Sequence, residues 1–258
     1  LWVTKQFRDL GDIIYVGDVE EMKTVVARDG ELHIGAGASL EAAWSALAER
    51  HPGLTDVWLR FASPPIRNAG TMGGNVANGS PIGDSPPILM ALDAQIELRQ
   101  GERVRRMPLP DFYVDYMKNR LEPGEFVQAV VVPGAAATRQ VRAYKISKRR
   151  DSDITAVAAG FCLSVENGTI AEARICFGGM AGTPKRAAGA EAALKGQPFA
   201  RDAFEAAARA VADDFTPLSD WRASADYRRT VAANLFRRFW LEQSEPGLPV
   251  RLRQSEGV

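Results

Sequence analysis

The segment from Phe61 to Pro87 places the strongest constraint on how this chain can fold. Its glycines and prolines stand among small polar residues, and neither the two-residue period of a strand nor the 3.6-residue period of a helix runs through it. Loops of this length are uncommon inside compact domains and usually serve a function or are disordered. Apolar residues recur along the segment and argue against disorder (Ile66, Met72, Val76 and Ile82). We therefore expect one long, ordered and functional loop.

Composition excludes several classes of protein. The 258 residues, 46% of them hydrophobic, suffice for one large domain or two of ordinary size. The 32 Lys and Arg balance the 32 Asp and Glu, so no uniform field attracts nucleic acid or anionic lipid. The apolar run Ile154–Val165 is too short to cross a bilayer, and Leu1–Leu10 lacks the apolar core of a secretion signal. We expect a cytoplasmic protein with no nucleic-acid or membrane partner.

Cysteine and histidine are too few for a metal centre. Cys162 and Cys176 are the only cysteines, no C-x-x-C motif occurs, and His33 and His51 are the only histidines. This argues against a zinc or iron-sulfur site within the chain. Neither histidine has a partner at metal-ligand or catalytic-triad spacing, so we expect both to be structural.

The first half reads as mixed helix and strand. We expect a helix from Ser39, as its N-cap, to about Arg50, with Leu40, Ala43, Trp44 and Leu47 on its buried face. Ser85 begins a further short helix that runs to about Asp93. A helix over 19–28 is expected between the first two strands, and the expected strands are 13–16, 32–34, 95–98, 103–107 and 125–132.

We place a domain boundary in the linker-like segment Pro133–Thr138, which gives domains 1–135 and 136–245 and a tail, 246–258. The second domain is expected to hold strands at 141–146, 154–165 and 170–177 and helices at 184–194, 200–212 and 223–243. Asn167-Gly168 forms a two-residue hairpin turn. An unbroken register from that turn sets Cys162 opposite Ala173 and Cys176 opposite Ala159, on opposite faces of the sheet, so no disulfide is expected.

The long loop carries the residues best suited to bind a ligand. Glycines let a backbone approach a ligand closely and point successive N–H groups at an anion. Neutral hydrogen-bonding side chains and one carboxylate accompany them (Thr71, Asn75, Asn78, Ser80 and Asp84). This inventory suits a bulky ligand with phosphates and hydroxyls. A glycine-rich surface loop held by Asx turns explains it equally well.

Two motifs in the loop resemble a known family. Ala69–Asn75 (A-G-T-M-G-G-N) and Asn78–Asp84 (N-G-S-P-I-G-D) are similar to the second flavin-binding segment in the FAD domain of molybdenum hydroxylases. The likeness is greatest to the small subunit of bacterial xanthine dehydrogenases. Four other segments agree in order and spacing (1–10, 144–153, 173–187 and 216–225). The resemblance implies an α+β fold: an FAD-binding domain of the CO dehydrogenase flavoprotein type, then an antiparallel sheet with helices.

The resemblance also assigns residues. It implies that Thr71, Gly73, Gly74 and Asn75 lie at the diphosphate and ribityl chain of FAD, and that Ser80 and Asp84 bind the adenosine end or its ribose. Phe61 corresponds to an aromatic residue that packs against the adenine or the flavin, and Lys145 to a lysine that reaches the flavin. Without the resemblance, Phe61 is an ordinary core aromatic and Lys145 a strand-edge lysine in solvent. We expect Asp84→Ala to weaken FAD retention without unfolding the protein.

The implied function is electron transfer in a xanthine dehydrogenase. A purine is hydroxylated at a molybdopterin centre on a large partner subunit, electrons pass through [2Fe-2S] clusters of an upstream domain to FAD, and FAD reduces NAD. The alternatives are the medium flavoprotein subunit of a carbon monoxide dehydrogenase or aldehyde oxidase with another acceptor, or a flavin-free interaction module. If the chain carries a flavin, the charged segment Lys148–Asp153 would lie near it. The alternative is that this segment is a solvated run of charges.

Two departures from related patterns matter. In the family, a first glycine-rich diphosphate loop precedes the segment that resembles Leu1–Lys5, and this chain begins without methionine. We therefore expect an N-terminally incomplete flavin site and weak FAD binding by residues 1–258 alone. Gly35-Ala36-Gly37 suggests a dinucleotide-binding turn, but Leu40 replaces the third glycine, which argues against a Rossmann fold.

Overall fold

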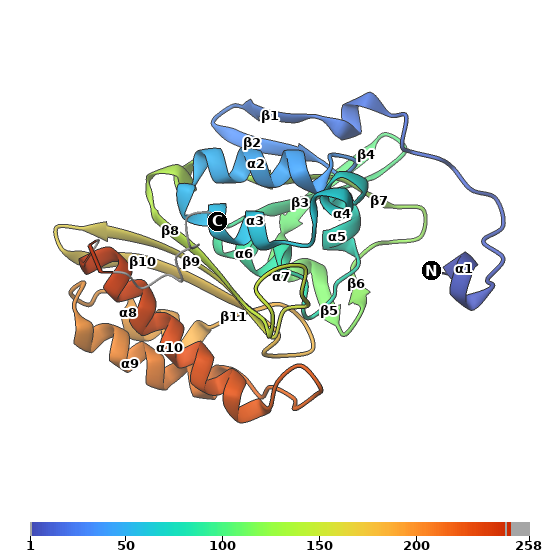
Figure 1. The fold of residues 1–258 in the computed structure, drawn as a ribbon. Helices are drawn as coiled ribbons and strands as arrows, with labels where there is room; N and C mark the ends of the chain where they lie inside the picture. Colours follow the sequence, from blue (N-terminus) through green and yellow to red (C-terminus); the bar gives the residue numbers. More distant parts are fainter. Residues whose placement is uncertain (1, 246, 249–258) are drawn as a thin grey trace, which may run out of the picture.

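The computed structural model describes residues 2–245, 247 and 248 and contains two antiparallel sheets with helices between and around them (Figure 1). The first sheet has the order β1-β2-β7-β3-β4, and the second has the order β11-β10-β9-β8. The expected α+β architecture is confirmed. No helix in the described part of the chain combines the length and apolar character needed to cross a membrane.

The first sheet is built from five short strands. They are β1 (Val25–Arg28), β2 (Glu31–Gly35), β3 (Gln95–Gln100), β4 (Arg103–Pro108) and β7 (Phe126–Val132). The small hairpin of β5 (Tyr113–Asp115) and β6 (Lys118–Asn119) follows the short helix α7 (Leu109–Phe112). Helix α2 (Leu40–Arg50) begins at its predicted cap, where Ser39 Oγ accepts the Ala42 N–H at 3.1 Å. Its predicted buried face is confirmed.

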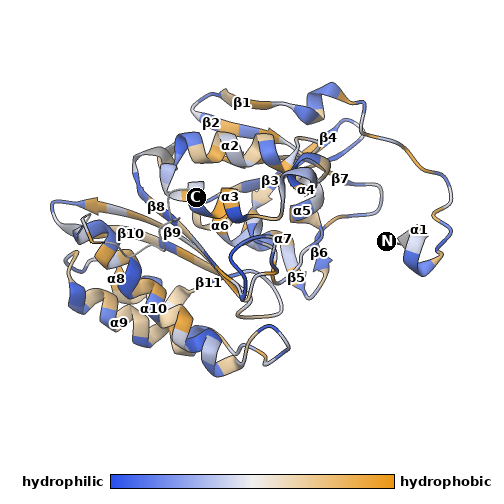
Figure 2. Ribbon diagram, viewed as in Figure 1, coloured by the Kyte–Doolittle hydropathy of each residue, from blue (hydrophilic) through white to orange (hydrophobic). Residues whose placement is uncertain are grey.

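The segment before β2 differs from expectation. A single 3₁₀ turn, Glu20–Lys23, stands where the helix over 19–28 was predicted, and β1 follows it. Asp29 and Gly30 both have positive φ and join β1 to β2 as a two-residue hairpin, which favours the β-branched Val25-Val26 as strand. The strand predicted at 13–16 is absent, since that stretch pairs with no described strand. Its hydrophobic side chains are exposed on an extended segment that leads from α1 (Trp2–Gln6) toward the sheet (Figure 2).

The long loop is broken into short helices, so the prediction that it lacks regular structure was wrong. Helix α3 (Thr55–Arg60) precedes it, and α4 (Pro64–Ala69), α5 (Met72–Ala77) and α6 (Ser85–Ala91) lie in it. Prolines in the first turns of α4 and α6 supply the helical φ without losing a hydrogen bond. A helix of one or two turns leaves no periodic pattern to detect. The helix at Ser85 was predicted from the prolines of its first turn instead.

Helix α6 is buried on all sides. Every residue from Ser85 to Ala91 is buried, and the helix contacts β9 (Val157–Glu166) and β10 (Thr169–Gly178) of the second sheet. A Cβ at Gly160 on β9 would lie 2.9 Å from the Ala91 Cβ and the Ile88 Cα. Glycine at this position therefore allows the close approach of the helix to the sheet.

The second sheet is completed by β8 (Gln140–Ile146) and β11 (Lys185–Arg186), with α8 (Ala188–Leu194), α9 (Arg201–Asp214) and α10 (Ala225–Ser244) packed beside it (Figure 1). The expected strands and helices are thus present with shifted ends. The Asn167-Gly168 hairpin is confirmed: Glu166 pairs with Thr169, and both turn residues have positive φ.

The predicted cysteine register was wrong. A bulge between Ile170 and Glu172 shifts the pairing, so Cys162 lies opposite Arg174 and Cys176 opposite Gly160. Both thiols consequently lie on the same face of the sheet and pack into the first core. Both are free, as expected, and burial raises the pKa of Cys162 to about 11.

Two hydrophobic cores occupy the molecule, but they do not separate at residue 135. The first lies around α2 and α6 and includes Val141, Ala143 and the two cysteines from the second sheet. The second lies between that sheet and α8 to α10 and is rich in phenylalanine. The 3₁₀ turn Gly134–Thr138 joins the sheets where the linker was predicted. The boundary at 135 therefore divides sheets rather than cores, and it stays a proposal.

The position of His51 predicts a pH dependence of stability. His51 ends α2, is 3% exposed, and its Nε2 has no partner among the described residues. Burial, together with the charge of Arg50, lowers the pKa of His51 from 6.5 to about 4. Between these values the unfolded chain binds more protons than the folded chain, so stability falls as the pH is lowered. We expect His51 to reduce the free energy of unfolding by about 2 kcal/mol at pH 5 relative to neutral pH.

Urea unfolding at both pH values measures this difference. His51→Phe should remove it while leaving the contribution of the carboxyl groups unchanged. An equal pH dependence in the wild type and the variant would contradict the assignment.

Candidate functional site

A groove of about 410 Å³ runs along α5, and we call it the α5 groove. One side is the turn between β2 and α2, and another is the start of β7. Its lining residues are Ala36, Gly37, Thr71, Gly73, Gly74, Ala77, Leu121, Glu125, Phe126 and Val127, with Val16, Gly17, Met22 and Lys23 from the segment before β1. The volume lies within the range of small-molecule and cofactor sites. Three of the predicted site residues meet here: Thr71, Gly73 and Gly74.

The first turn of α5 is fixed by the β2–α2 turn. Met72 N–H donates to the Ala38 carbonyl and Gly73 N–H to the Ala36 carbonyl, both at 2.9 Å, and Gly74 N–H donates to Thr71 Oγ1 at 3.2 Å. The expectation that successive amides of this turn point at an anion was therefore wrong, because protein acceptors already hold them. A Cβ at Gly73 would lie 2.8 Å from the Ala36 Cα, so Gly73 serves close packing.

Gly74 differs from Gly73. It is exposed, and the only atom that a Cβ there would meet is Thr71 Oγ1, at 3.0 Å. A side chain at position 74 would therefore occupy the groove without displacing the protein backbone. The next residue, Asn75, is half-buried, and its Oδ1 is buried with no hydrogen-bond partner among the described residues. A buried acceptor of this kind is costly unless something else donates to it.

The opposite wall combines apolar side chains with a neutralised carboxylate. Phe126 and Val127 supply the apolar surface. Glu125 accepts from Arg105 Nε and Nη2, both at 2.7 Å, and from Arg103 at 3.0 Å. The hydrogen bond from Arg105 is the main cause that lowers the pKa of Glu125 to about 2. Glu125 is thus ionised and paired, so it adds little net charge to the groove.

Asp84 and Lys145 lie together in a buried ion pair at the N-terminal end of α6. Lys145 Nζ lies 2.6 Å from Asp84 Oδ2 and donates to Thr155 Oγ1 at 2.7 Å, and the Thr155 hydroxyl donates to Asp84 Oδ1. Asp84 and Lys145 are 4% and 3% exposed. The solvated strand-edge reading of Lys145 is therefore wrong. Each Asp84 oxygen already has a protein partner, so the structure does not present this carboxylate as a free ligand for a ribose.

The remaining predicted residues lie apart from the groove. Phe61 is 7% exposed in the first core, with its ring 5.7 Å from that of Trp44, which matches the ordinary core reading. Ser80 lines a second cavity of about 600 Å³ between the loop, the β5–β6 turn and the segment before α10. Its hydroxyl accepts the Ile82 N–H at 3.4 Å. Seven of the eight predicted residues thus divide between the groove, the Asp84 pair, the core and this cavity, and the eighth, Asn75, lies on α5 without lining the groove.

Several positioning residues were not predicted. Tyr113 Oη donates to the Val76 carbonyl and Asn119 Nδ2 to the Ala77 carbonyl, both at 3.0 Å, which anchors the end of α5. Thr155 completes the Asp84 pair. No local motif marks these residues, because each acts on a segment distant in the sequence. Ala36 and Gly37 did carry a signal, the Gly-Ala-Gly turn that follows β2, which resembles a dinucleotide-binding turn but lines the α5 groove.

The buried pair predicts a strong energetic coupling. Asp84→Ala leaves the Lys145 ammonium buried without its counterion, and Lys145→Met leaves the Asp84 carboxylate in the same state. We expect each to lower the free energy of unfolding by about 3 to 5 kcal/mol. The double variant should lose less than the sum of the two, with a coupling of about 1 to 3 kcal/mol.

Urea unfolding of the four proteins completes this double-mutant cycle. The expectation that Asp84→Ala affects only flavin retention is replaced by this one. Wild-type stability in Asp84→Ala, together with loss of flavin, would restore the reading of Asp84 as a direct ligand contact.

Comparisons with known proteins match both halves of the chain. Residues 1–135 match the family described as the FAD binding domain in molybdopterin dehydrogenase, and residues 142–243 match the CO dehydrogenase flavoprotein C-terminal domain. The carbon monoxide dehydrogenase medium chain of Afipia carboxidovorans is 35% identical over 234 residues, which cover 90% of this chain and 77% of that protein. The xanthine dehydrogenase FAD-binding subunit of Escherichia coli O157:H7 is 30% identical over 220 residues, covering 84% and 75%.

Other relatives are much longer. The nicotinate hydroxylase of Emericella nidulans is 32% identical over 250 residues, and the match spans 88% of this chain but only 18% of that enzyme. Among solved structures, a carbon monoxide dehydrogenase from Hydrogenophaga pseudoflava superposes with a TM-score of 0.79 at 29% identity, covering 85% of this chain and 77% of that one. The sequence and the fold agree: this chain belongs to the FAD-binding flavoprotein family of the molybdenum hydroxylases.

Proposed function

We propose that the chain carries FAD in a xanthine dehydrogenase and passes electrons from the hydroxylation of a purine to NAD. The α5 groove carries the proposal for the cofactor, and the similarity to the E. coli xanthine dehydrogenase subunit supports the choice of enzyme. The proposed partners are a molybdenum-binding large subunit with its molybdopterin and an iron-sulfur domain with [2Fe-2S] clusters. Both would supply electrons to this chain.

The residues of the α5 groove fit part of an FAD molecule. The groove is mostly apolar, which suits the flat face of a flavin ring, and the few polar groups at its edge suit the hydroxyls of a ribityl chain. Asn75 lies on the same helix but outside the lining of the groove, and its buried Oδ1 is an acceptor with no hydrogen-bond partner among the described residues. The open space above Gly74 lets a ligand approach the backbone. When bound, FAD supplies the two-electron chemistry, and the protein supplies binding and orientation.

In this proposal each part of the groove has a physical task. Thr71 fixes α5 by capping it, so Gly74 presents a flat backbone surface. Phe126 and Val127 exclude water from the opposite side. The Glu125 carboxylate is held by two arginines, so it does not repel a phosphate as a free carboxylate would.

We expect Gly74→Val to abolish flavin retention without unfolding the protein, because the new side chain fills the groove. The measurement is the ratio of flavin to protein in the purified assembled enzyme, with circular dichroism as the test of folding. The affinity for flavin should fall by at least about tenfold, which corresponds to about 1.4 kcal/mol of binding free energy.

Ala42→Val is the matched control. Ala42 is the third residue of α2, is exposed, and its N–H donates to a hydroxyl cap, as does the N–H of Gly74 in α5. Both variants therefore place a β-branched residue in the same helical position, but only one faces the groove. Normal flavin content in Gly74→Val would remove α5 from the cofactor site.

The choice of substrate and acceptor has its own test. Under the proposal, NADH added to the assembled enzyme in the absence of oxygen bleaches the visible absorbance of the flavin. The same enzyme also reduces NAD when xanthine is supplied. The second candidate, a carbon monoxide dehydrogenase, is favoured by the 35% identity to the medium chain of Afipia carboxidovorans. Flavin bleaching by carbon monoxide, with no response to xanthine or NADH, would overturn the xanthine dehydrogenase proposal and establish that candidate.

A further inference from the structure

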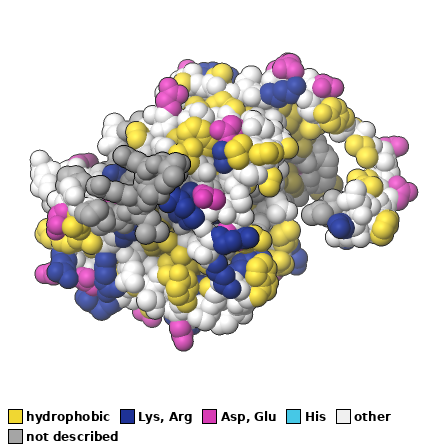
Figure 3. All heavy atoms as spheres, viewed as in Figure 1, with side chains coloured by type: hydrophobic (Ala, Val, Ile, Leu, Met, Phe, Trp, Pro, Cys, Tyr) yellow, Lys and Arg dark blue, Asp and Glu magenta, His cyan; other side chains and the backbone are white. Residues whose placement is uncertain are grey.

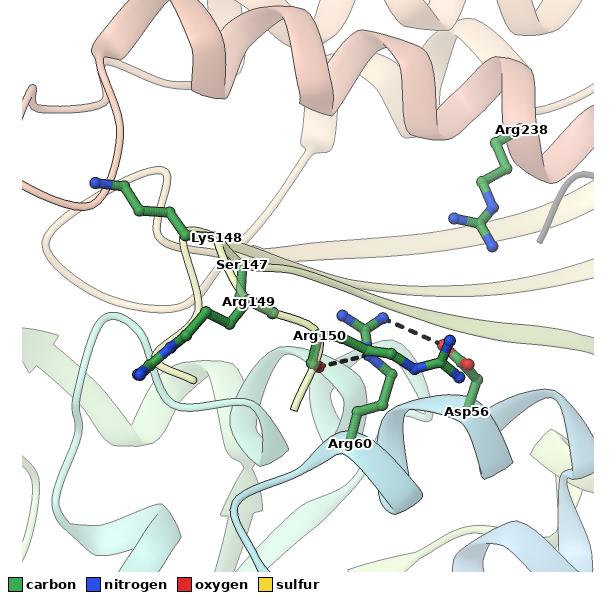
Figure 4. A pocket seen from close by; sticks show the side chains of 7 residues that line it. All are labelled: Asp56, Arg60, Ser147, Lys148, Arg149, Arg150 and Arg238. Carbon is green, nitrogen blue, oxygen red and sulfur yellow. Dashed lines mark hydrogen bonds and ion pairs between the residues drawn. The ribbon is translucent and has the colours of Figure 1, made fainter. Parts of the chain in front are cut away.

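A pocket of about 190 Å³ lies between the two halves (Figure 4) and shares no lining residue with the α5 groove. Asp56 and Arg60 of α3 come from the first half. The segment after β8, residues 147–150, and Arg238 of α10 come from the second half. A ligand in this pocket would therefore contact both halves at once. The pocket is smaller than the usual site for a complete cofactor, so it suits one or two compact chemical groups.

The pocket is rich in arginine. Arg60, Arg150 and Arg238 extend toward the same space, whereas Lys148 and Arg149 extend to the other side (Figure 4). Lys148 Nζ donates to the Trp221 carbonyl at 2.7 Å, and Arg149 pairs with Asp153 at 3.1 Å. These two side chains are already engaged elsewhere. The space-filling view also shows Lys and Arg side chains gathered near the middle of this face (Figure 3).

The three converging arginines are only partly neutralised. Arg60 Nη1 lies 3.5 Å from Asp56 Oδ2, and its Nε donates to the Arg150 carbonyl at 3.1 Å, so Arg60 mainly braces the segment. Arg150 has a carboxylate only at the limit of an ion pair, Asp151 at 4.0 Å.

Arg238 donates through Nε to Glu242 at 2.9 Å, and Arg142 shares that carboxylate at 3.6 Å. The guanidinium carbon of Arg238 also lies 5.0 Å from the centroid of the Tyr144 ring. The pocket thus keeps excess positive charge, and Arg150 and Arg238 are the cations with donor groups to offer.

We propose that this pocket binds a small anion bearing one or two phosphate groups and thereby links α10 to the segment after β8, which Arg60 of α3 braces. Guanidinium groups match phosphate oxygens with paired N–H donors, and two of them from separate elements can hold one phosphate from two sides. The site is separate from the α5 groove and does not rest on the proposed function. Binding would brace the segment between β8 and β9. This segment follows directly on β8, the strand that holds Lys145.

Titration calorimetry on the flavin-loaded assembled enzyme at physiological salt tests the proposal. The probes are inorganic phosphate and pyrophosphate for free phosphate, and ribose 5-phosphate for a phosphate ester. We expect saturable binding of at least one probe. Arg150→Gln and Arg238→Gln should each weaken it about ten- to a hundredfold, as the loss of a charge-assisted hydrogen bond does.

Arg149→Gln is the matched control, because it removes the same charge from the same segment on a side chain that extends away from the pocket. It should change the affinity by less than twofold. A preference for pyrophosphate or for the ester identifies which source of phosphate the pocket takes. Absence of saturable binding by all three probes would overturn the proposal. So would an Arg149→Gln effect as large as that of Arg150→Gln, since it would show attraction to net charge rather than a site.

Discussion

The contact between α6 and the second sheet is the constraint on which the rest of the structure depends. The helix has no exposed face: it packs against β9 and β10 of the second sheet, and its apolar side chains share the first hydrophobic core with those of the first sheet. Gly160 permits that approach on one side. On the other side, Trp44 Nε1 of α2 donates to Ser85 Oγ at 3.2 Å. At its N-terminal end the buried Asp84–Lys145 pair adds a directional link to the nonspecific packing.

The candidate site follows from this arrangement. The loop that leads into α6 is held at both ends, by the β2–α2 turn at Gly73 and by the second sheet at Asp84. Between these points, α5 has little freedom, and its exposed Gly74 is presented to the groove at a fixed place. The packing of Gly73 against Ala36 and the burial of Asp84 against Lys145 thus determine where Gly74 is presented. A sequence motif shared by a family can therefore mix ligand contacts with residues that only position them.

The sequence predicted the elements whose pattern is local. The Ser39 cap, the Asn167-Gly168 hairpin and the buried face of α2 were recovered because each rests on neighbouring residues. The bulge near Ala171 was not predicted, because the expected register ran unbroken from the turn, and one inserted residue shifts every later cross-strand partner by one position. The pairing of Asp84 with Lys145 was not predicted, because the two residues are 61 positions apart in the sequence. The resemblance assigned eight residues to one site, but it did not tell that Phe61 and the Asp84–Lys145 pair lie apart from the α5 groove.

Native-state hydrogen exchange of Gly160→Val tests the central claim, that the two sheets share α6 and open as one unit. A valine at position 160 would collide with Ala91 and with the backbone of α6. If the claim is right, the slowest-exchanging amides of β2 and β7 and those of β9 and β10 lose the same opening free energy in the variant. Loss of protection in one sheet, with the other unchanged, would show that each half folds on its own core and would contradict the claim.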